Sequence, residues 1–257
     1  MKKLRHSLDR PTRSDFVQSG IVKLVENFCN NEGKGELFMS TRKTIGGALG
    51  AIIVLIVAQI LAQLVASLFV LVKIPEGICN IIAGIIYVGL AFVLSELFSK
   101  RLLKIKIENL GMPKFSIKAK WIIVGVLLPV TVKAVYLFFF SGKYVSSGMN
   151  SNQIFSTLSA GIAFTGIAAG FVEEVILNLL KEKWNIKVAV LIPSVLFGLV
   201  HIIGMDFSII SSLLVLIAGT MVGIMFSMVA IESGSVWNSG IVHSLWNILI
   251  IGGGLSI

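Results

Sequence analysis

Two adjacent carboxylates, two histidines and one amide lie inside stretches of the chain that are otherwise almost wholly apolar: Glu173, Glu174, His201, His243 and Asn247. A carboxylate and an imidazole that meet at one point can hold a water molecule and remove its proton. A second imidazole and an amide can donate hydrogen bonds to the oxyanion that forms when water attacks an amide carbonyl. If these side chains converge, their types predict peptide-bond hydrolysis.

Other chemistry fits the same residues. Glu173, His201 and His243 could bind a divalent metal such as zinc and leave one position open for water. Glutamate and histidine could also relay protons in a coupled transporter, although we find no internal repeat that would favour a transporter. A single buried histidine or asparagine can simply hydrogen-bond across helices. The case for a site depends on whether all five residues lie at one depth.

The elements that carry these residues must be membrane helices. Apolar residues make up 56% of the 257 residues and charged residues only 14%, which is far from the balance of soluble domains. The net charge of +9 is concentrated beside apolar spans, so we predict no nucleic-acid partner and instead expect contact with membrane lipid. The fold class is therefore an all-α, polytopic transmembrane helical bundle.

About seven stretches are long enough to span a bilayer. They cover residues 46–72, 78–98, 121–141, 154–180, 188–203, 208–231 and 235–256. Lys and Arg are concentrated in residues 1–45, 99–120 and 181–187, which predicts that these segments and the N-terminus are cytoplasmic. We divide the chain into a basic arm (1–45), a hairpin with a basic loop (46–118) and a transmembrane core (119–257).

The spacing of the polar residues favours convergence. His201 follows Phe197 by four residues and Asn247 follows His243 by four, so each pair shares one helical face. Glu173 lies eight residues before Lys181, about 12 Å from the predicted membrane boundary at 1.5 Å per residue. The same reasoning places the two histidines about 12 to 20 Å deep. Three helices thus bring polar groups into one slab of the membrane.

The order of these motifs resembles a known family. Glu-Glu in "GFVEEVILNLL", then Phe-x-x-x-His in "PSVLFGLVH", then His-x-x-x-Asn in "GSVWNSGIVHSLWN" resembles the CAAX protease and bacteriocin-processing family of intramembrane proteases. The family includes the type II CAAX prenyl endopeptidase and the bacterial Abi proteins. The resemblance covers about residues 120–250. It implies an intramembrane endopeptidase that cuts a peptide or a membrane-tethered protein.

The resemblance also implies roles for the five residues. Glu173 would activate water, with Glu174 as its supporting acid, and His201 would share that water. His243 and Asn247 would form the oxyanion site. A metal-dependent and a metal-free mechanism both remain open. The implied location is a bacterial cell membrane, and the implied biological roles are bacteriocin immunity and peptide processing.

One position departs from the family pattern. The family motif reads Glu-Glu-x-x-x-Arg, whereas this chain has Asn178 at the arginine position. Asparagine keeps a hydrogen-bond donor but lacks the positive charge. Lys181 or Lys133 could compensate. Alternatively, the chain is a catalytically inactive relative that acts as a membrane scaffold or immunity protein.

Overall fold

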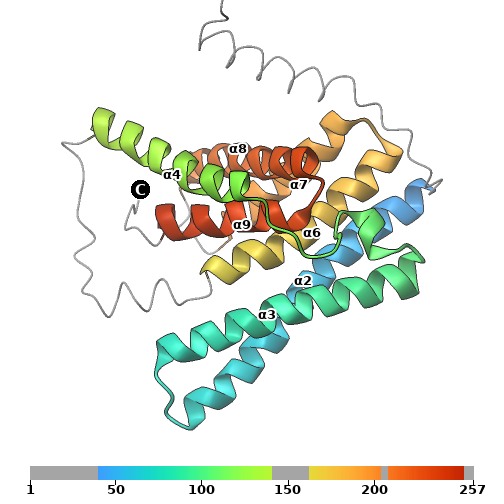
Figure 1. The fold of residues 1–257 in the computed structure, drawn as a ribbon, viewed down its shortest axis with the longest axis horizontal. Coiled ribbons are helices and arrows are strands. Elements are labelled where there is room, and N and C mark those ends of the chain that lie inside the picture. The colour runs from blue at the N-terminus through green and yellow to red at the C-terminus, as the bar shows by residue number, and fades with distance from the viewer. Residues whose placement is uncertain (1–39, 141–161, 204–207, 252–257) are drawn as a thin grey trace, which may run out of the picture.

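The structure, a computed structural model, describes residues 40–140, 162–203 and 208–251. Nearly all of the predicted N-terminal arm lies outside these residues, as do residues 154–161 of the predicted fourth span. The described chain is a bundle of helices (Figure 1), which confirms the predicted all-α membrane fold. The helices are α2 (Thr41–Leu71), α3 (Glu76–Phe98), α4 (Ala119–Phe140), α6 (Ile162–Lys183), α7 (Ile186–Val200), α8 (Ile209–Ser233) and α9 (Val236–Trp246).

Each of the seven described α-helices overlaps one predicted span, but they differ in length. By length and composition, four described segments are long and apolar enough to cross a membrane: Thr41–Leu71, Glu76–Leu103, Ala119–Phe139 and Ile209–Ser233. α7 is shorter, with 15 residues, and ends at Val200 instead of the predicted 203. α9 gives way at Asn247 to a π-helix, η4 (Asn247–Ile251). π-Helical turns often occur at functional sites.

Small residues let the helices approach closely. α2 buries Ala51, Ala58 and Ala62 at helical spacing, and it packs against α3 and α6. α7 and α8 meet where a Cβ on Gly219 would lie 2.7 Å from the Cα of Gly198. Close backbone contact through small residues is a common way for membrane helices to associate.

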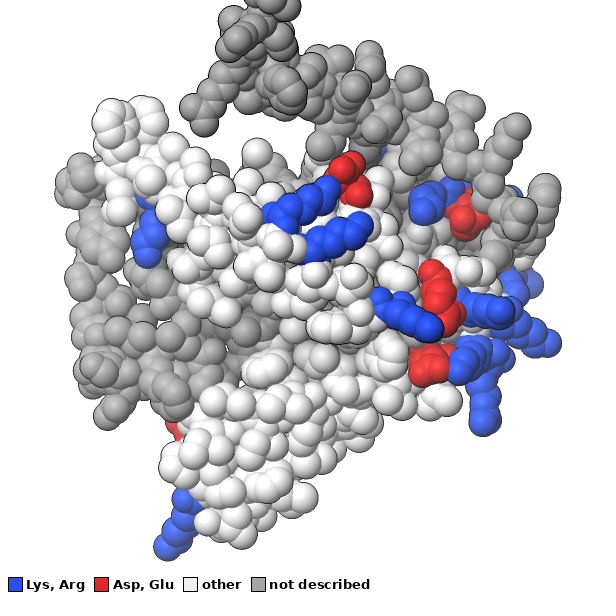
Figure 2. All heavy atoms as spheres, viewed as in Figure 1, with Lys and Arg blue, Asp and Glu red and all other residues white. Residues whose placement is uncertain are grey.

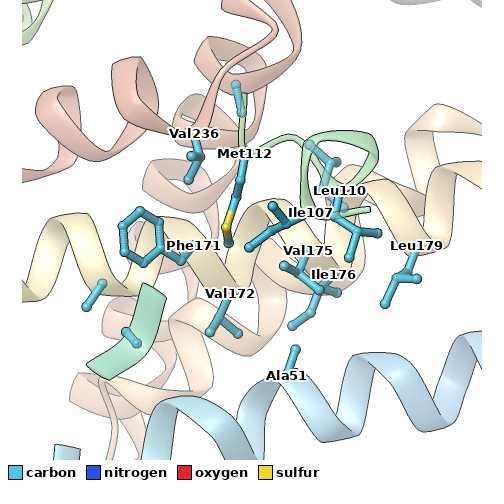
Figure 3. Packing of buried hydrophobic residues seen from close by; sticks show 14 of the residues in the cluster. Ala51, Ile107, Leu110, Met112, Phe171, Val172, Val175, Ile176, Leu179 and Val236 are labelled. Atoms are coloured by element: carbon cyan, nitrogen blue, oxygen red, sulfur yellow. The ribbon is translucent and has the colours of Figure 1, made fainter. Parts of the chain in front are cut away.

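The segment between α3 and α4 connects the first helix pair to the rest of the bundle. It contains a π-helix, η1 (Ser99–Leu103), and a 3-10 helix, η2 (Ile107–Leu110). Val236 N–H donates to the Gly111 carbonyl at 3.1 Å, and the Trp237 indole N–H donates to the Pro113 carbonyl at 2.7 Å. Figure 3 shows Ile107 and Leu110 packed beside Val175 and Ile176 of α6. This segment thereby positions the start of α9 against α6.

The charged residues gather toward one end of the bundle. In Figure 2 most Lys and Arg side chains of the visible face lie toward the end where η1 follows α3. Glu96 and Lys100, four residues apart, form an exposed ion pair there. Lys120 and Glu232 form a second exposed pair at 3.6 Å.

Candidate active site

Four of the five predicted site residues line one cavity of about 300 Å³. Glu173 comes from α6, His201 from the end of α7, His243 from α9 and Asn247 from the start of η4. The remaining walls are mostly apolar, and α2 supplies part of them. The other lining residues are Ile52, Leu55, Thr165, Ala169, Val172, Ile176, Pro193, Leu196, Phe197 and Val200.

Glycines hold α6 and α9 close enough for this convergence. A Cβ on Gly166 would lie 2.7 Å from the backbone nitrogen of Ser244. A Cβ on Gly170 would lie 3.3 Å from the Cα of Gly240. Because Ser244 directly follows His243, this contact sets how near His243 lies to the face of α6 that carries Glu173.

His201 is held by its own helix. It caps the C-terminus of α7, and its Nδ1 lies 2.7 Å from the Phe197 carbonyl oxygen. Since a carbonyl oxygen can only accept, Nδ1 carries the proton and Nε2 offers a lone pair. The Phe197 ring packs on the same imidazole at a centroid distance of 4.3 Å. In the neutral imidazole this contact fixes the tautomer, with Nε2 as the acceptor.

His243 is enclosed by aromatic rings. It is 4% exposed and stacks on Phe226 at a centroid distance of 4.1 Å with an interplanar angle of 20°. Phe197 meets it edge-on at 5.3 Å. Phe226 carries no signal in the sequence, since it is one of many apolar residues of α8, and its role is visible only from the packing.

Two buried polar atoms of the site residues lack a hydrogen-bond partner within the described part of the chain. They are Oε1 of Glu173 and Nδ1 of His243. Leaving a buried polar group unsatisfied costs about 1–3 kcal/mol. Such a group in a native protein needs an explanation, and a catalytic role or a bound water molecule is one. Both residues line the same cavity, which is suited to bind a small polar reactant.

Glu174 lies on a different face of α6 from Glu173. It is 4% exposed and lines a second, polar cavity of about 350 Å³ together with Asn178, Lys181 and Glu108. The Asn178 side-chain amide donates to Glu174 Oε1 at 2.9 Å and to the Glu174 carbonyl at 2.9 Å. Lys181 is therefore the cation that shares a cavity with Glu174, whereas Lys133 lines neither cavity.

The described residues contain no group of three or more His, Cys, Asp or Glu side chains arranged to hold a metal ion. Glu173, His201 and His243 share a cavity but do not form such a group. The described donor arrangement gives no support to the zinc alternative.

Together the fold and the cavity define a polytopic α-helical membrane protein with a polar site of glutamate, histidine and asparagine between its helices. Residues 40–249 match the type II CAAX prenyl endopeptidase Rce1-like family. The chain belongs to this family of proteases, as its motifs predict, and the family supports a CAAX-protease-like intramembrane peptidase. Neither the curated proteins nor the solved structures yielded a match to the chain.

Proposed function

We propose that this protein is an intramembrane endopeptidase in which Glu173 activates water. The observation that carries the proposal is the shared cavity, where Glu173, His201 and His243 come from three different helices. The walls are mostly apolar, and a low local dielectric strengthens each electrostatic interaction inside. General base catalysis needs a base within hydrogen-bond reach of the reacting water. Glu173 lines this cavity, and its buried Oε1 has no hydrogen-bond partner among the described residues.

The reaction runs in two steps. Glu173, with Nε2 of His201 as a second acceptor, orients the water and takes one proton while the hydroxide oxygen bonds to the amide carbon. N–H groups of His243 and Asn247 stabilise the resulting oxyanion. Glu173 then passes its proton to the amide nitrogen, the C–N bond breaks, and a carboxylic acid and an amine leave, the acid giving its remaining proton to the amine to form a carboxylate and an ammonium ion. The base is regenerated without a co-reactant.

The cavity walls favour a particular substrate class. Ile52 and Leu55 of α2 and Leu196 of α7 face the site, so an apolar side chain beside the scissile bond gains by burial. We propose a peptide or a membrane-tethered protein as the substrate. We further propose that the charged end of the bundle faces the cytoplasm of a bacterial cell, and that the activity serves peptide processing or bacteriocin immunity.

The test is cleavage of a peptide library by the purified protein. Glu173→Gln and His243→Ala are each expected to lower cleavage by at least about 100-fold, the scale of losing a general base or an oxyanion donor. Glu232→Gln is the matched control, because this carboxylate is exposed and outside the cavity. Equal cleavage by wild type and Glu173→Gln would refute the proposal.

A second candidate function is a scaffold or immunity protein without catalysis. The observation that favours it is Asn178 at the position of the family arginine, which leaves Glu174 with a neutral partner. In this case wild type and Glu173→Gln protect cells equally, although neither cleaves any peptide. A cellular assay with both proteins at matched membrane levels separates the two functions.

A further inference from the structure

A second face of the α2–α3 hairpin forms a groove that the proposed reaction does not use. Its volume is about 430 Å³, and its walls are apolar except at one residue, Arg101. The lining residues are Ile53, Val54, Val57, Leu94, Leu97, Phe98, Arg101 and Leu102. On α2, residues 52 and 55 face the active-site cavity, whereas residues 53, 54 and 57 face this groove. The two cavities therefore lie on different faces of one helix.

The groove is lined by residues of two membrane-span helices, and several of its side chains are exposed. Ile53 is 60% exposed and Leu97 45%, although both belong to helices apolar enough to cross a bilayer. Side chains exposed at bilayer depth contact lipid chains instead of water. A flexible hydrocarbon chain is the ligand that such a surface accommodates.

Arg101 gives the groove a charged end. Glu96, a nearby acid, is held by Lys100, and no described carboxylate forms an ion pair with Arg101. Arg101 lies in the π-helix η1, which ends where Lys104 adopts a left-handed conformation at φ 60°. A planar guanidinium binds phosphate through two parallel hydrogen bonds, which an ammonium group cannot do.

We propose that this groove binds one anionic phospholipid, with an acyl chain between α2 and α3 and the phosphate on Arg101. The apolar walls of the groove favour a lipid over free phosphate, because free phosphate has no hydrocarbon chain to pack against them. The guanidinium selects an anionic head group over a zwitterionic one, since a choline cation beside the phosphate would oppose it. The site is independent of the proposed peptidase activity.

Native mass spectrometry of the delipidated protein tests this assignment. The probes are phosphatidylglycerol and phosphatidylcholine with identical acyl chains, added in equal amounts. Wild type is expected to retain phosphatidylglycerol in preference, and Arg101→Gln to lower that preference about tenfold, the scale of one charge-assisted hydrogen bond. Lys104→Gln is the matched control because Lys104 is exposed but does not line the groove.

Three results would overturn the assignment. The preference could survive in Arg101→Gln. It could fall equally in Lys104→Gln, which would indicate diffuse attraction to the basic loop and no defined site. Finally, the groove-filling variant Val57→Phe is expected to lower retention of both lipids. If it instead changes the oligomeric state with lipid retention unaltered, a second copy of this chain occupies the groove.

Discussion

The side-chain amide of Asn178 donates a hydrogen bond to Oε1 of Glu174 at 2.9 Å, one turn earlier on α6. This pairing holds the second acid of the Glu-Glu motif in the polar cavity beside Lys181. Glu173, the adjacent residue, lines the apolar cavity with the two histidines. The two carboxylates therefore lie in different environments on two faces of one helix.

Asn178→Ala is expected to lower the free energy of unfolding by about 1–3 kcal/mol, because the buried Glu174 loses a hydrogen bond. Denaturant unfolding in detergent measures this loss. Cleavage should fall less than in Glu173→Gln, since Asn178 does not line the proposed catalytic cavity. The same substitution in a Glu174→Leu background should cost much less. An equal cost in both backgrounds would show that the hydrogen bond is not responsible.

Gly111→Ala is expected to destabilise the protein more than Gly234→Ala. Both glycines have positive φ, 83° and 63°, so each substitution incurs about 1–2 kcal/mol of backbone strain. A Cβ on Gly111 would also clash with the side chains of Glu174 and Asn178, whereas a Cβ on Gly234 meets no atom within 4 Å. Thermal unfolding of the two variants makes the comparison. Similar losses of stability would contradict the close approach of Gly111 to Glu174.

Gly166→Ala is expected to reduce cleavage strongly. Its Cβ would lie 2.7 Å from the backbone nitrogen of Ser244, so α9 must shift and carry His243 with it. Overpacking of this kind costs about 1–3 kcal/mol of stability, and a displacement of about 1 Å in an active site can lower the rate about 100-fold. Cleavage rate and thermal unfolding are measured together.

The control for that variant is Gly89→Ala on α3. A Cβ at this position meets no atom within 4 Å, so the substitution should leave both properties unchanged or raise stability slightly. Wild-type cleavage in Gly166→Ala would show that helix spacing at Ser244 does not set the geometry of the site.

Leu55→Trp is expected to narrow the apolar cavity and to slow cleavage of substrates with large side chains at the scissile bond. Leu55 lines the cavity, whereas the neighbouring Ile56 does not and is 52% exposed. Ile56→Trp is therefore the control. Comparing kcat/KM for peptides with small and large apolar residues measures the effect. If both variants changed kcat/KM to the same extent, α2 would not form part of the substrate site.

Chelators are expected to leave cleavage unchanged, because the described residues do not group three metal-binding side chains. Elemental analysis of active protein should find less than one metal ion per chain. The expectation would be wrong if the wild-type protein contained one zinc ion per chain and both Glu173→Gln and His201→Ala lost it.

Several features of the site could be predicted from the chain alone. The apolar stretches could be predicted because a bilayer demands about 20 such residues per crossing. The order of the Glu-Glu, Phe-x-x-x-His and His-x-x-x-Asn motifs predicted the family by resemblance, and the spacing of four in the last two motifs places each pair on one helical face. The contributions of α2 and Phe226 could not be predicted, since no local pattern separates a wall residue from a lipid-facing one.

By itself, the sequence determined the membrane class, the order of the helices and the residues able to do acid–base chemistry. Tertiary structure alone decided that Glu173 shares a cavity with His201, His243 and Asn247 while Glu174 faces Asn178 and Lys181. The physical reason is that adjacent residues on a helix point about 100° apart. Whether the side chain at a given position lies near a histidine or near an amide depends on where the neighbouring helices pack.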